Sequence, residues 1–201
     1  MERTTGTAAQ RAASALSRHR LRRLNRWLVV PLFRLGLGGI FGDPLGGWVL
    51  VLRTRGRRSG QVREVGLDYV IDRGSIYCLA GFGPTTAWLL NLQADPAVEV
   101  LLPGRAVRGH AEVVLDPGER SRVIPKVIRA AGFASLTVDA DPWHVGDERI
   151  LAEIGDLPLV RIRVRGLAAG PADPGGAFWI VKYVACVVLA GLLLRRAFTR
   201  R

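Results

Sequence analysis

The stretch that decides the fold is residues 48–63, WVLVLRTRGRRSGQVR. It begins as a run of valine and leucine, a composition typical of a strand buried on both faces. The sequence RGRRSG at residues 55–60 interrupts this run, and residues 61–71 resume a strand-like pattern. Two strands joined by a glycine-containing turn predict a β-hairpin.

The turn of this hairpin is unusually basic. Arg53, Arg55, Arg57, Arg58 and Arg63 place five guanidinium groups within eleven residues, and their mutual repulsion is costly unless an anion lies among them. Guanidinium groups bind phosphate and carboxylate bidentately, and glycine lets backbone N–H groups approach the same ligand. The turn is interpreted either as a site for a polyanionic small molecule or as a solvated basic turn.

The basic charge is concentrated at the N-terminal end. The formal net charge is +12. Residues 1–63 hold thirteen arginines and two acidic residues, which gives a net charge of +11. Residues 64–201 hold sixteen basic and fifteen acidic residues, which gives +1. Such an asymmetry suits anionic lipid, nucleic acid or an acidic ligand. A chain of 201 residues can bury one good core, and no internal repeat requires a second domain.

The two cysteines occupy unlike settings. Cys78 lies in an expected core strand and Cys186 in a C-terminal apolar segment. No CxxC pair and no cysteine–histidine pair at metal-ligand spacing occurs, so the sequence predicts no metal site. This use of cysteine favours a reducing, cytoplasmic compartment.

Residues 11–36 show an amphipathic helical pattern in which leucine and tryptophan are interleaved with arginine. Pro31 is expected to kink or end this helix, and Gly36 to stop what continues past it. A basic face opposite an apolar face is typical of a helix on an anionic membrane surface. The same apolar face would also be buried if the helix covered an open end of a barrel, and both interpretations stay open.

The order of elements predicts a mainly β fold with flanking helices. A helix is expected at residues 87–93, with Thr85 or Thr86 as its N-cap; another is expected at 117–131, where Pro125 would kink or split it, and a short one at 148–155. Six short strands, mostly linked as hairpins, predict a small six-stranded antiparallel barrel. The strands are expected at residues 48–54, 61–71, 75–80, 98–102, 106–115 and 157–165.

The C-terminal region begins with a linker rich in glycine and proline and continues as FWIVKYVACVVLAGLLL at residues 178–194. A helix of this length spans about 25 Å, somewhat less than the ~30 Å of a hydrocarbon core. Because the segment is apolar all round, contact with a membrane is favoured over packing on the barrel. Whether the helix spans the membrane or lies in it stays open.

The order of motifs resembles the deazaflavin-dependent nitroreductase family, whose members are also described as quinone-reductase-like. The resemblance covers residues 24–164, and its most specific parts are TxGRRSG at residues 54–60 and WxxNL at residues 88–92. A GFGP loop at residues 81–84 and DPxVxV at residues 95–100 complete it. The resemblance implies a split β-barrel of the flavin-reductase-like kind.

This family binds coenzyme F420, a deazaflavin with a phosphate and an oligoglutamate tail. By resemblance, the turn would hold the phosphate and the glutamates, the glycine loop would lie along the deazaflavin ring, and two helical residues would brace that loop. The implied cofactor-binding residues are Arg55, Gly56, Arg57, Arg58, Ser59, Gly60 and Arg63 in the turn, Gly81, Phe82 and Gly83 in the loop, and Trp88 and Asn91 in the helix.

The resemblance implies hydride transfer from reduced coenzyme to an electron-poor acceptor such as a quinone or a nitroaromatic compound. The ring carries the hydride, so no catalytic acid–base residue of the chain is required. Phe133 and Leu136 stand where family nitroreductases can carry tyrosines, and His144 follows in a loop; these three are the expected acceptor-binding residues. An apolar pocket beside membrane-seeking helices favours a lipid-soluble quinone. His110, in an expected strand, is interpreted as structural.

Two other functions stay open at this point. The same barrel could use FMN, because the turn could hold a single phosphate, or the chain could be a non-enzymatic protein that binds lipid or nucleic acid through its basic N-terminus. Nucleic acid is disfavoured, since no aromatic–basic platform is present. A homodimer is possible, and the expected location is the cytoplasmic face of the cell membrane.

The expected organisation has four parts. Residues 1–40 form the basic amphipathic helix region, residues 41–166 the cofactor-binding split barrel, residues 167–177 the linker, and residues 178–201 a membrane-associating helix with a basic end.

Overall fold

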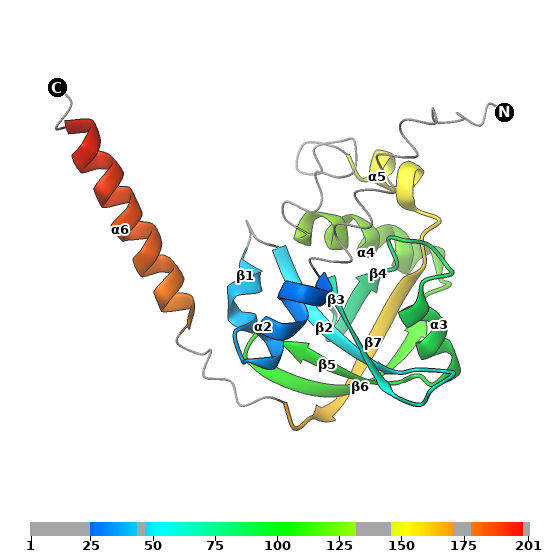
Figure 1. Ribbon diagram of the computed structural model, residues 1–201. Helices are drawn as coiled ribbons and strands as arrows, with labels where there is room; N and C mark the ends of the chain where they lie inside the picture. Colours follow the sequence, from blue (N-terminus) through cyan, green and yellow to red (C-terminus); the bar gives the residue numbers. More distant parts are fainter. Residues whose placement is uncertain (1–24, 44–46, 132–145, 171–177, 199–201) are drawn as a thin grey trace, which may run out of the picture.

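The computed structural model describes residues 25–43, 47–131, 146–170 and 178–198. Figure 1 shows antiparallel strands curved into a barrel, helices against its outside, and a long C-terminal helix, α6. Strands and helices follow one another along the chain in the order that the sequence predicts. The strands are β1 (Gly42–Asp43), β2 (Gly47–Arg55), β3 (Val62–Asp72), β4 (Ser75–Leu79), β5 (Ala97–Leu102), β6 (Arg105–Val113) and β7 (Leu159–Leu167).

Strands β2 to β7 close into a barrel because β2 pairs with β5 as well as with β3. Neighbours around the barrel follow the order β2, β3, β4, β7, β6, β5, and every pairing is antiparallel. The prediction of a six-stranded antiparallel barrel with flanking helices is confirmed. Strand β1 was not predicted: it adds only two residues beside the start of β2, too few to show an alternating pattern.

Strand β2 is buried on both of its faces, as its run of valine and leucine predicts. Leu50 and Leu52 point into the barrel interior and belong to the main core. Val49 and Val51 point outward, where Val30 and Phe33 cover them. The two faces alternate along the strand, so an apolar run without polar interruptions is what this position requires.

Two elements from the N-terminal region supply this outer cover. They are η1, a π-helical turn (Asn25–Val29), and α2 (Val30–Arg34). The prediction that Pro31 disturbs the helix matches the change from π to α geometry at Val30, but the helix does not end there and runs on to Arg34. Gly36 then adopts a φ of +76°, which ends it. Within this segment Val29, Val30 and Phe33 pack on the barrel, whereas Trp27 and Leu28 stay exposed; the expected helix before them lies outside the described residues.

Helix α3 (Ala87–Ala94) packs Trp88, Leu89 and Leu92 into the barrel interior. Helices α4 (Pro117–Ala130) and α5 (Asp147–Ile154) cover another part of the outer surface and share a second core with β4 and β7. Asp116 caps α4 by accepting a hydrogen bond from the N–H of Glu119 at 2.6 Å.

The sequence left open whether Pro125 kinks its helix or splits it, and the structure rules out the split. Helix α4 is continuous from Pro117 to Ala130, with Pro125 inside it and buried. The neighbouring side chains Val123, Ile124 and Val127 are at most 2% exposed and pack on the barrel. Their burial offsets the loss of one helical hydrogen bond at the proline.

Helix α6 (Phe178–Phe198) projects from the barrel in Figure 1 and approaches it at η2 (Gly38–Phe41). Its large apolar side chains between Tyr183 and Leu193 are each at least 55% exposed, so this part of the helix is not packed on the barrel. Within the described part of the chain, no helix is long and apolar enough to cross a membrane.

Candidate functional site

The β2–β3 turn is held in shape by its own backbone. The N–H of Gly56 donates to the carbonyl of Gln61 at 2.8 Å, and the N–H of Gly60 donates to the carbonyl of Gly56 at 2.7 Å. Gly60 has a φ of +66°, a conformation that favours glycine. A Cβ at Gly56 would lie 3.0 Å from Ser59 Oγ and 3.1 Å from the Gln61 carbonyl oxygen, a tight fit that favours glycine there.

The arginines of the turn carry charge that the described protein does not neutralise. Arg55 is 72% exposed and lies 3.8 Å from Asp95, a weak contact. Among the described residues, no carboxylate pairs with Arg57, Arg58 or Arg63; Arg63 donates only to Ser59 Oγ, at 3.4 Å. Three neighbouring guanidinium groups without a carboxylate are suited to bind an anion.

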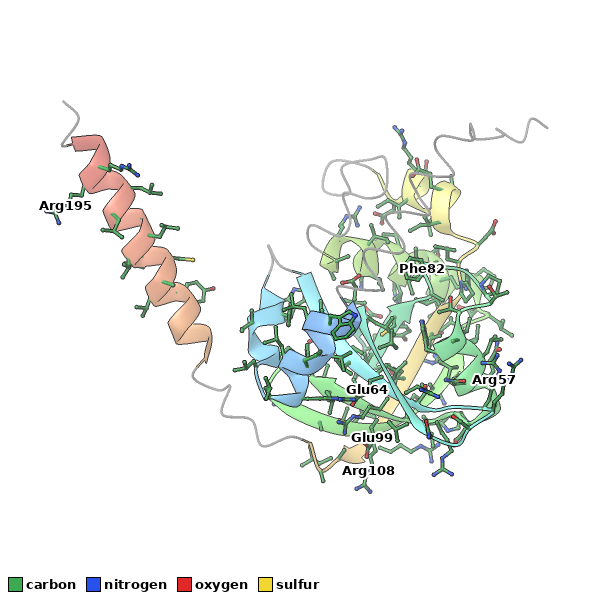
Figure 2. The ribbon with its side chains drawn as sticks, in the orientation of Figure 1. Arg57, Glu64, Phe82, Glu99, Arg108 and Arg195 are labelled. Carbon is green, nitrogen blue, oxygen red and sulfur yellow. The ribbon has the colours of Figure 1, made fainter. Side chains whose placement is uncertain are left out.

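Arg53 has a different role from its neighbours in the sequence. Its side chain lies on the outer face of the barrel, where it donates to Glu64 at 2.8 Å and lies 3.6 Å from Glu99. Glu99 also lies 3.8 Å from Arg108, and Glu64 also pairs with Arg34 on α2. Glu64, Glu99 and Arg108 are labelled in Figure 2, away from Arg57. Arg53 therefore belongs to an ion-pair ladder across the strands.

Asn91 on α3 connects that helix to the turn. Its Oδ1 accepts hydrogen bonds from the backbone N–H of Arg57 at 3.2 Å and from Arg57 Nη1 at 3.3 Å, and its Nδ2 donates to Thr54 Oγ1 at 3.3 Å. Asn91 is 5% exposed and Thr54 2% exposed; they are the two buried polar side chains of the described residues. Figure 2 shows Arg57 beside α3.

Sequence reasoning missed the part played by Thr54. The signal was available, since Thr54 is a polar residue at the end of an otherwise apolar strand and opens the TxGRRSG motif. A buried hydroxyl needs a hydrogen-bond partner, and α3 supplies it through Asn91.

The glycine loop precedes the same helix. The N–H of Gly83 donates to the Ala80 carbonyl at 2.8 Å, and Thr86 Oγ1 donates to the Gly83 carbonyl at 2.7 Å. Thr86 is the N-cap residue, as predicted, but its side chain braces the loop instead of capping the helix. A Cβ added at Gly81 or at Gly83 would meet no atom within 4 Å, so the space above this backbone is open.

The structure thus places the predicted turn and the predicted loop at α3. Trp88, on the same helix, is 6% exposed and lies in the barrel core, a position suited to bracing and not to direct contact with a ligand. Phe82 is half-buried in the loop. The ligand-binding roles of all these residues remain predictions.

The other predicted residues do not join this group. Phe133, Leu136 and His144, the expected acceptor-binding residues, lie outside the described residues. His110 lies on β6 opposite Arg163 of β7 and is half-buried, which agrees with a structural position.

The shifted pKa values lie in the barrel wall. Burial raises the pKa of the Cys78 thiol, and the nearby Asp68 carboxylate raises it further, so this cysteine is not a reactive thiolate. Burial also raises the pKa of Asp68, to about 6, against a weaker lowering by its own backbone hydrogen bond. Both cysteines are free, and within the described ranges no three His, Cys, Asp or Glu side chains gather as a metal site.

A family model and several solved structures are similar to this chain. The model of a family described as F420H(2)-dependent quinone reductase matches residues 32–136, just over half of the chain. Among solved structures, the chain is similar to an F420-H2 dependent reductase, FDR-A, at 23% identity over 58% of this chain and 93% of that one, with a TM-score of 0.39. It is also similar to an F420 reductase at 20% identity over 61% and 90%, with a TM-score of 0.42. A conserved hypothetical protein from Mycobacterium tuberculosis matches at 23% identity over 59% and 73%, with a TM-score of 0.45.

Proposed function

The chain belongs to the F420H(2)-dependent quinone reductase family, and from this premise we propose that it reduces a quinone with coenzyme F420. The family establishes the enzyme class, an F420-dependent oxidoreductase, and the cofactor. Membership of this family decides against two alternatives that the sequence left open. These are FMN as the cofactor and a non-enzymatic protein that binds lipid or nucleic acid. The acceptor and the residues that bind it are part of the proposal.

The observation that carries the site assignment is the unneutralised charge of the β2–β3 turn. Arg57, Arg58 and Arg63 have no carboxylate partner among the described residues, and Arg55 has only the weak contact with Asp95. A phosphate followed by several glutamates offers the complementary charges in series. The residues present therefore fit the acidic part of the coenzyme, and we assign its binding to this turn.

The glycine loop is assigned to the deazaflavin ring. The open space above Gly81 and Gly83 allows a flat group to approach the backbone, and Phe82 between them adds an aromatic side chain. When bound, the coenzyme supplies the hydride. The chain's own contribution is to hold both ends of the coenzyme against α3, to orient the ring and to exclude water from it. No acid–base residue of the chain is assigned.

A quinone is favoured as acceptor by the family and by the exposed apolar surface of α6. Seven large side chains on this helix, among them Val187 at 70% exposure, face solvent. Such a helix suits the surface of a membrane, where a lipid-soluble quinone resides. We therefore propose that the protein acts at the cytoplasmic face of the membrane and meets its acceptor there. A homodimer stays a prediction.

The assignment of the turn is tested by Arg57→Ala combined with Arg58→Ala. Because each guanidinium group would make charge-assisted hydrogen bonds to the coenzyme, the dissociation constant for F420, followed by fluorescence, is expected to rise about a hundredfold. The matched control is Arg105→Ala combined with Arg165→Ala, which removes two exposed charges from β6 and β7. Equal binding by the two double variants would refute the assignment.

The acceptor is tested by anaerobic oxidation of reduced F420 with a water-soluble menaquinone analogue and, separately, with a nitroaromatic compound. Turnover with the quinone analogue and little with the nitroaromatic compound is expected. The reverse preference would leave the F420-dependent activity in place and remove the quinone from the proposal.

A further inference from the structure

Arg57 is the one arginine of the turn whose side chain is fixed by a buried group of the described protein. Asn91 holds both its backbone N–H and its guanidinium group, and Thr54 holds the amide of Asn91 in turn. The orientation of the amide is determined by its partners, because Oδ1 faces two donors and Nδ2 faces a hydroxyl oxygen. Arg57 is therefore positioned, although its charge is not cancelled.

This arrangement differs from that of several structural arginines of the chain, although Arg120 on α4 is likewise held by neutral acceptors, the carbonyls of Val114 and Leu157. At two places on the barrel wall and one on α4, an arginine is held by a carboxylate, which fixes its position and also places an opposite charge against it. These pairs are Arg53 with Glu64 at 2.8 Å, Arg161 with Glu112 at 2.8 Å, and Arg122 with Asp72 at 3.1 Å.

We infer that Asn91 is a positioning residue that holds Arg57 through a neutral acceptor and so keeps the full charge of this guanidinium group for an anionic ligand, an inference that rests on the proposed function. A carboxylate at this position would make the same two hydrogen bonds with better energy. It would also occupy the guanidinium group with an opposite charge and repel a phosphate or a glutamate nearby. Asparagine at position 91 therefore favours the binding of an anion by Arg57, whereas aspartate would disfavour it.

Two properties can change separately if Asn91 preserves charge: the shape of the turn and its affinity for anions. If the role of Asn91 is purely structural, the two properties change together. If Asn91 only braced the turn, aspartate would replace it without loss of binding, because its Oδ1 accepts the same two hydrogen bonds and its second oxygen can accept one from the Thr54 hydroxyl group. If Asn91 preserves charge, aspartate keeps the turn in place and still weakens the binding of anions. The distinction does not depend on the deazaflavin ring.

The test compares wild type with Asn91→Asp in binding two probes, coenzyme F420 and inorganic pyrophosphate, while thermal unfolding reports the fold. For the variant we expect at least about tenfold weaker binding of both probes, at an unchanged or higher melting temperature. The loss should shrink as the pH falls through the pKa of the introduced carboxyl group, because its protonated form is again neutral. In an Arg57→Ala background, Asn91→Asp should have a much smaller effect.

A second variant covers the case in which Asn91→Asp does not fold. Thr54→Val conserves the shape of the buried side chain and removes the partner of the Asn91 amide, so binding of both probes should weaken a few-fold while the protein stays folded. Undiminished binding in Thr54→Val would overturn the inference in that case.

The two probes also separate this inference from the proposed function. If wild type binds F420 and Asn91→Asp binds it equally well, the inference is wrong and the proposed function stands. If wild type binds pyrophosphate but not F420, and the variant loses pyrophosphate, the proposed function is wrong and the inference stands. If wild type binds neither probe, both are wrong.

Discussion

At the scale of single residues, the same side-chain type has different roles according to its partner. Arg53 lies two positions before Arg55 in the sequence, yet it points to the outer face of β2 and pairs with Glu64. The clustering of arginines in the sequence predicts a turn that binds an anion, and this stays a prediction. It could not show which of them are committed to the barrel wall, because that depends on the register of β2 against β3 and β5.

Asp68 offers a prediction about pH. The carboxyl group lies half-buried opposite Val49, and burial raises its pKa from 3.8 to about 6. Between these two values the folded state binds more protons than the unfolded state, so the free energy of unfolding falls as the pH rises. Asp68→Asn should therefore raise the free energy of unfolding at pH 7.5 by up to about 3 kcal/mol, and the gain should vanish below about pH 4.

The matched control for Asp68 is Asp72 on the same strand. Arg122 and Lys126 donate hydrogen bonds to its carboxylate and hold its pKa below the ordinary value. Asp72→Asn should therefore lower the melting temperature at pH 7.5, and the difference from wild type should shrink as the pH falls below 4. A melting curve for Asp68→Asn that matches wild type at both pH values would contradict the role assigned to its burial.

At the scale of elements, the sequence predicted most boundaries to within a few residues because glycine and proline mark them. The turns at Gly60, Gly74 and Gly104 all have positive φ, and each separates two paired strands. The sequence could not predict features that depend on tertiary packing, such as the continuity of a helix through a proline. Helix α4 continues through Pro125 because its apolar neighbours are buried.

The separate parts of the candidate site could be predicted from the sequence, but the contacts that join these parts could not. The basic turn and the glycine loop are visible as motifs, whereas the hydrogen bonds of Asn91 to Arg57 and Thr54 join residues more than thirty positions apart. Only the placement of α3 against the end of β2 brings them together. For the acceptor side, the predicted residues lie outside the described part of the chain.

The proposed binding to a membrane is tested by removing α6. A variant that ends after Gly170 keeps β7 complete and also keeps the hydrogen bond from Ala168 to Ala106. Because the exposed apolar side chains of α6 are removed, binding to vesicles of phosphatidylglycerol and phosphatidylcholine should fall about tenfold or more in a sedimentation assay. F420 binding should not change. Equal sedimentation of the truncated and full-length proteins would contradict membrane binding through α6.

At the scale of the whole molecule, charge is distributed unevenly along the sequence, and large exposed apolar side chains gather on α6. Most of the net charge lies in residues 1–63, and the turn within this region presents guanidinium groups that the described protein leaves unneutralised. The barrel provides the rigid frame, since its strands pair on both sides and leave α3 in a fixed position against β2. This frame holds the turn and the loop at one helix.

The central claim is that this turn binds the acidic end of the cofactor. The most direct measurement is the affinity of the wild-type protein for intact F420 and for the deazaflavin fragment that lacks phosphate and glutamates, at low and high salt. Intact F420 is expected to bind at least about a hundredfold more tightly than the fragment at low salt, and salt should reduce this difference. Equal affinities for the two compounds, unaffected by salt, would contradict it.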